Sequence, residues 1–86
     1  MKFQGAVINE QGVTFAIVIV KKSVIDFPSE AIKAIQSFQP FFPGIPILLM
    51  AQDHHGIPTY YGRKDIAQFM ASVPLHAVPW KEYTTN

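Results

Sequence analysis

Three neighbouring side chains, Asp53, His54 and His55, belong to types that bind metal ions or transfer protons. Metal-binding histidines on one element are usually spaced so that they converge, as at positions i and i+4 of a helix, whereas adjacent side chains tend to point apart. Asp53 also has the residue type expected at the first position of a turn, where its carboxylate accepts hydrogen bonds from nearby backbone N–H groups. We therefore expect a solvated turn, with an acid–base or metal-binding role as the alternative.

Two cations, Arg63 and Lys64, stand where a helix is expected to begin. The free N–H groups and the dipole at this end of a helix favour anions rather than cations. A small anionic ligand, such as a phosphate or a carboxylate, would explain the two cations, with Tyr61 beside it and Gly62 admitting it to the backbone. The other explanation is that both side chains extend into water, or that Arg63 pairs with a carboxylate from another element. The motif is short and lacks a glycine-rich phosphate loop, so both explanations stay open.

The rest of the sequence offers little for catalysis. The chain has no cysteine, which excludes thiol nucleophiles, thiolate metal sites and disulfides. No serine lies in a Gly-x-Ser-x-Gly context, and each carboxylate is explained by a cap, a turn or an exposed position. We therefore assign no catalytic residue, cofactor or metal ion, and we favour a protein that is not an enzyme.

The segment Gly56-Ile57-Pro58-Thr59 resembles the residues around the cis-proline of thioredoxin-like proteins. The resemblance covers four of 86 residues, and the chain lacks the Cys-x-x-Cys motif of that family. It therefore implies no function for this chain.

The composition indicates one folded domain over residues 1–86. Hydrophobic residues make up 49% of the chain and charged residues 15%, against about 25% charged residues in an average domain. The net charge of +1 gives no reason to expect nucleic acid as a partner. The longest apolar run, residues 13–20, is too short to span a membrane, which takes about 20 residues. With no cysteine and no visible export signal, the sequence predicts a cytoplasmic protein with no membrane partner.

Turn residues and periodicity predict the order β-β-α-β-β-α-β. An Asn9-to-Gly12 turn joins two strands in a hairpin, and Asp26 and Pro28 mark the start of the first helix as N-cap and first-turn residue. The strands are expected at residues 1–8, 13–20, 46–51, 57–61 and within 77–83, the last at a sheet edge, and the helices at residues 27–39 and 63–73. The fold class is therefore α+β, with a mixed, mostly antiparallel sheet of four or five strands packed with two helices. The two hairpin–helix units are alike, which duplication and convergence both explain.

Two strands, at residues 13–20 and 47–50, are apolar on both faces. If both helices cover the same side of the sheet, these strands leave an apolar face bare, and such a patch normally marks an interface. If the helices cover opposite sides, no partner is needed. We favour an interaction module that forms a homodimer through a sheet face or an edge strand. The alternative is a small-anion binding protein or enzyme that uses residues 62–65.

Overall fold

The chain begins with the predicted hairpin. The computed structural model describes residues 2–10 and 12–84, in which β1 (Lys2–Glu10) pairs antiparallel with β2 (Val13–Ile19). Because Glu10 pairs with Val13, only residues 11 and 12 separate the strands, and the turn lies one residue further along the chain than the predicted turn from Asn9 to Gly12. Gly12 has a φ of +78°, which suits a two-residue hairpin connection. Met1 and Gln11, which were also part of the predicted hairpin, lie outside the described residues.

Two helices follow β2 where the sequence predicts one. The short α1 (Lys22–Asp26) comes before α2 (Pro28–Phe38). Phe27 between them is extended, as expected for a residue that precedes a proline. Asp26 is not the N-cap of α2, as predicted from the sequence, because its carboxylate accepts a hydrogen bond from the Lys22 ammonium within α1.

The remaining elements include two short 3₁₀ helices that were not predicted, and the others lie within a few residues of their predicted positions. They are η1 (Gln39–Phe41), β3 (Ile47–Gln52), β4 (Pro58–Tyr61), α3 (Lys64–Ala71), η2 (Leu75–Ala77) and β5 (Lys81–Thr84). The described residues contain no cis peptide bond, so the peptide bond before Pro58 is trans, unlike that of the cis-proline in thioredoxin-like proteins.

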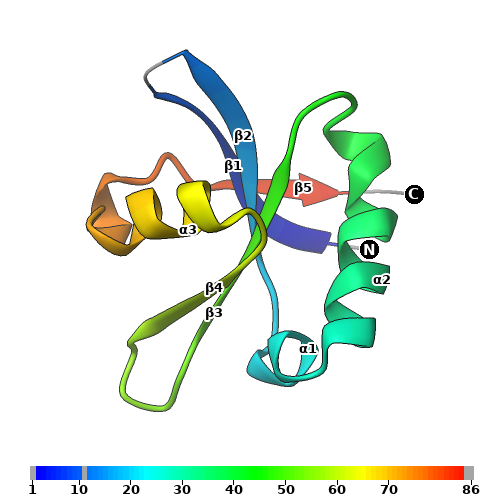
Figure 1. The fold of residues 1–86 in the computed structure, drawn as a ribbon, viewed down its shortest axis with the longest axis vertical. Helices are drawn as coiled ribbons and strands as arrows, with labels where there is room; N and C mark the ends of the chain where they lie inside the picture. The colour runs from blue at the N-terminus through cyan, green and yellow to red at the C-terminus, as the bar shows by residue number, and fades with distance from the viewer. Residues whose placement is uncertain (1, 11, 85–86) are drawn as a thin grey trace.

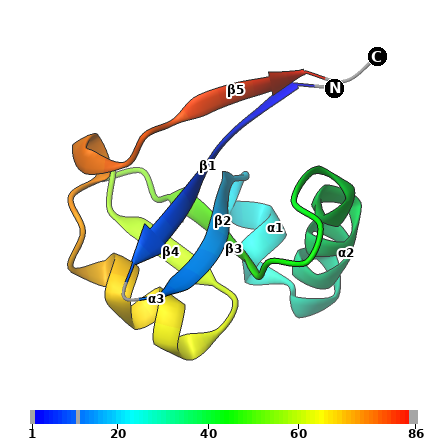
Figure 2. The same ribbon diagram turned by 90° about the horizontal axis from the view of Figure 1, so that it is seen from above.

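The strands form one five-stranded sheet in the order β4-β3-β2-β1-β5 (Figures 1 and 2). The central strands β2 and β3 are parallel and every other neighbouring pair is antiparallel. The predicted α+β class with a mixed, mostly antiparallel sheet is confirmed, and β5 is an edge strand as expected.

The helices cover opposite faces of the sheet (Figure 2). On one face, α1 and α2 pack against alternate residues of β2 and β3; the buried residues of this core include Ala16, Val18, Ile25, Ala31, Phe38, Leu49 and Ala51. On the other face, α3 packs against the residues in between; this second core includes Phe15, Ile17, Leu48, Met50, Ile66 and Met70. Both central strands are therefore buried on both faces, as predicted, and no bare central face remains among them.

An aromatic cluster fastens β5 to the first of these cores. Tyr83 pairs across the strands with Phe3, and their rings stack with centroids 5.0 Å apart. The Phe3 ring also lies 4.7 Å from that of Phe38, and Phe42 lies 5.2 Å from Tyr83. Since the other side chains of β5 are exposed and polar, Tyr83 provides most of its apolar packing. Among the described residues no helix is long and apolar enough to cross a membrane.

Candidate functional site

The Asp53–Gly56 turn is built as the sequence predicts. One carboxylate oxygen of Asp53 accepts hydrogen bonds from the backbone N–H groups of His55, at 2.8 Å, and Ile57, at 3.0 Å. These contacts give Asp53 a local structural role, because they close the connection between β3 and β4.

The two histidines of this turn lie together rather than apart. Their ring centroids are 3.9 Å apart and both side chains are exposed. A structural zinc site needs about four ligands. Across residues 2–10 and 12–84, no group of three or more His, Cys, Asp or Glu side chains could hold a metal ion. The acid–base or metal-binding role of Asp53, His54 and His55 stays a prediction from the sequence.

At the start of α3, Arg63 already has an anionic partner. Its guanidinium donates two hydrogen bonds to the carboxylate of Asp65, at 2.7 and 3.2 Å. Hydrogen bonding to Arg63 holds the pKa of Asp65 below its ordinary value, and the same contact raises the pKa of Arg63. The carboxylate of Asp65 also places a negative charge in the first turn of α3, which suits the helix dipole. Arg63 thus has a carboxylate partner, but the partner is Asp65 of the helix that Arg63 begins rather than a residue of another element, as the sequence had suggested.

Gly62 is explained by packing. Its φ is +152°, and a Cβ atom there would lie 2.9 Å from the Leu48 side chain and 3.2 Å from the carbonyl oxygen of Ile47. Tyr61 packs into the core beneath α1 and α2, on the face opposite α3. The structure therefore does not bring Tyr61 together with the helix that Arg63 and Lys64 begin, and anion binding there stays a prediction.

The two basic pairs of the sequence are also separated. Lys21 and Lys22 lead into α1 on one face of the sheet, whereas Arg63 and Lys64 lead into α3 on the other. Since nucleic-acid binding would require these four residues on one face, the fold gives it no support.

The sequence reading missed an open strand edge. β1 has nine residues, but β5 pairs only with Lys2 to Gly5. Residues 6–10 of β1 pair with β2 on one side and have no strand partner among the described residues on the other. Val7 lies in this stretch with 46% of its surface exposed. The short, polar β5 was the only signal in the sequence that β1 would be partly uncovered.

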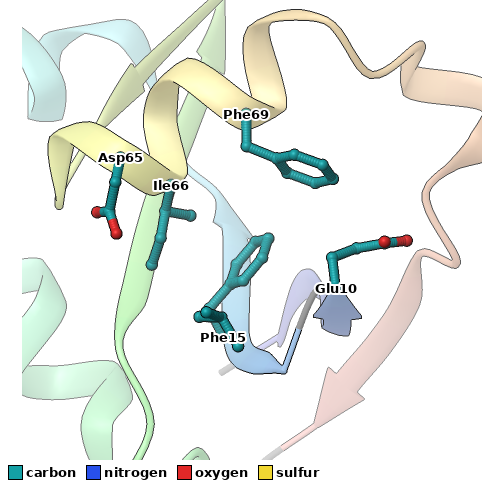
Figure 3. Close-up of a pocket in the computed structure, with 6 residues that line it drawn as sticks. Glu10, Phe15, Asp65, Ile66 and Phe69 are labelled. Atoms are coloured by element: carbon teal, nitrogen blue, oxygen red, sulfur yellow. The ribbon is translucent and has the colours of Figure 1, made fainter.

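The open edge borders an apolar groove that α3, β2 and the segment 77–79 also line. One part is a cleft of about 170 Å³, in which the Phe15 and Phe69 rings meet edge to face between Glu10 and Asp65 (Figure 3). A second cleft of about 300 Å³ shares Glu10 and Phe69 with the first and runs along Val7 and Ile8. The unpaired backbone groups of β1 therefore lie next to an apolar groove. An extended segment could pair with the backbone of β1 and place its side chains in the groove.

Comparison with known proteins finds no matching family model, no curated protein similar to the chain and no solved structure that matches its fold. Any proposal for its function therefore rests on the geometry above.

Proposed function

We propose that this chain is a non-enzymatic interaction module, and that it forms a homodimer by pairing the open edge of β1 with the same edge of a second copy. The supporting observation is the stretch of residues 6–10, which has no second strand partner among the described residues, contains the exposed Val7 and borders an apolar groove. Pairing through a central sheet face, the other route suggested by the sequence, gains no support because helices pack on both faces.

The other two edges of the sheet are protected against such pairing. β4 begins with Pro58, which has no N–H group to donate. β5 carries Lys81 and Glu82, and charged residues on an edge strand disfavour edge-to-edge association. The open stretch of β1 has Glu10 as its only charged residue.

The open stretch can pair over its full length with the same stretch of a second copy. In an antiparallel pairing centred on Ile8, residues 6–10 of one copy lie opposite residues 10–6 of the other. The hairpin turn of one copy then lies next to Gly5 of the other copy, which is where the pairing with β5 begins. Such a pairing is self-complementary, as a two-fold interface requires.

This register also suits the side chains. The two Ile8 side chains meet on the face of α3, where Ile8 lines the groove. Each Val7 is opposite Asn9 of the second copy and diagonal to its Val7, close enough for apolar contact. Glu10 lies opposite Ala6, so the two carboxylates are not placed against each other.

The mass of the protein at micromolar concentration tests this proposal. By sedimentation equilibrium we expect a dimer of twice 9.6 kDa for the wild type. Val7→Lys, which puts a charge on the open edge, should give a monomer. Ile32→Lys is the matched control, since Ile32 is 49% exposed, close to the value for Val7, but lies on α2 and lines neither cleft of the groove. A wild-type monomer, or a Val7→Lys dimer as stable as the wild type, would refute the proposal.

A further inference from the structure

A second opening lies on the other side of β1, where the hairpin divides. β1 pairs with β2 only from Gly5 onward, whereas its first four residues follow β5. Figure 2 shows this start of β1 running with β5 away from the end of β2. Gly5 stands at the branch, where a Cβ atom would lie 2.8 Å from the carbonyl oxygen of Ile17, so only glycine fits between the strands.

The divergence leaves a cleft of about 430 Å³ with an apolar lining. The cleft is broad and open to solvent, so a bound molecule would lie against its apolar floor rather than inside an enclosed cavity. Its apolar residues come from both strands and from the helices above them; they are Phe3, Ile19, Val20, Val24 and Phe38. Phe3 and Phe38 are almost fully buried and form the floor, since they belong to the core beneath α1 and α2.

The rim of the cleft is positively charged. Lys2 from β1 and Lys21 from the end of β2 both line it, and no acidic residue does so among the described residues. The nearest carboxylate to the Lys2 ammonium is that of Glu82, at 4.0 Å, and both side chains are more than half exposed. Such an ion pair is weak. Lys21 makes no ion pair within residues 2–10 and 12–84. Both ammonium groups are therefore available to an anion.

From this combination we infer that the cleft between β1 and β2 binds an amphipathic carboxylate, a molecule with an acyl or aryl body and one carboxylate group. The apolar body replaces water against Phe3, Val20 and Phe38, and the carboxylate meets the ammonium groups of Lys2 and Lys21. This site is independent of the proposed dimer, which uses the opposite edge of β1 in residues 6–10.

Titration of the full chain with butanoate, hexanoate and octanoate, followed by amide chemical shifts, tests the inference. We expect shifts at Phe3, Val20 and Val24, and affinity that rises with chain length by up to about fourfold for each buried methylene group. Octylammonium, which has the same body and the opposite charge, should bind more weakly than octanoate. Absence of shifts at these amides, or equal binding of the two octyl compounds, would overturn the inference.

A charge-reversal variant tests the role of the rim. Lys21→Glu should weaken octanoate binding by about two- to fivefold, because a favourable contact with an exposed ammonium group becomes a repulsive one. Lys64→Glu makes the same change of charge on the opposite face and should leave the affinity unchanged. Octanoate binding that is equally strong in Lys21→Glu and the wild type would contradict the assignment.

Discussion

Tyr60 carries a hydroxyl group that is buried without a hydrogen-bond partner in the described part of the chain. Its side chain packs against the core on the face of α3. A buried polar group without a partner loses its hydrogen bonds to water on folding and receives none in return. We expect Tyr60→Phe to raise the free energy of unfolding by about 1 kcal/mol, as measured by urea denaturation. A loss of stability in this variant would show that the hydroxyl has a partner in solution.

The same residue gives a pH dependence. Burial raises the pKa of Tyr60 above its ordinary value, so the unfolded chain releases the proton at lower pH than the folded one. The folded state therefore keeps its full stability below about pH 10 and loses it as the pH rises further. The loss between neutral pH and about pH 11 should be smaller in Tyr60→Phe than in the wild type.

At the scale of elements, Gly62 joins β4 to α3 in a position that only glycine fits. We expect Gly62→Ala to cost about 2–3 kcal/mol of stability, because the new methyl group meets Leu48 and the backbone of β3. Gly56→Ala is the matched control. Gly56 also has a positive φ, of +80°, but a Cβ atom there meets nothing within 4 Å, so the cost should be about 1 kcal/mol.

Chemical denaturation of the two glycine variants makes this comparison. Equal losses would mean that strain at φ, rather than contact with β3, explains Gly62. The Gly62 variant also bears on the small-anion prediction, since a glycine needed only to admit a ligand would tolerate alanine without loss of stability.

At the scale of the whole molecule, the two cores share the strands β2 and β3. Because these strands contribute alternate residues to each core, loss of either core removes support from the same backbone. We expect Phe38→Ala and Met70→Ala, one from each core, to destabilise the protein by about 3 kcal/mol each. In both variants, Trp80 fluorescence and far-UV circular dichroism should report one coincident transition. Separate transitions would mean that α3 and its core unfold independently.

The sequence alone determined the elements whose signals are local. The hairpin, the helices at residues 28–38 and 64–71 and the buried strand β3 follow from turn residues, prolines and apolar periodicity, which act over a few positions. The Asp53 turn was predictable for the same reason, because its hydrogen bonds span two and four residues. The short α1 escaped prediction, since five residues carry too little periodicity.

Only the tertiary structure decided what covers each surface. The parallel crossover from β2 to β3 restricts where α1 and α2 can pack, because such connections are nearly always right-handed. No such rule applies to α3, which follows an antiparallel hairpin, and its position depends on Ile66 and Met70 packing against the far face. The open edge of β1 likewise depends on where β5 pairs, more than 70 residues along the chain. The apolar residues of the two central strands are thus buried on both faces of the sheet, and the unpaired backbone groups of β1 lie at a strand edge instead.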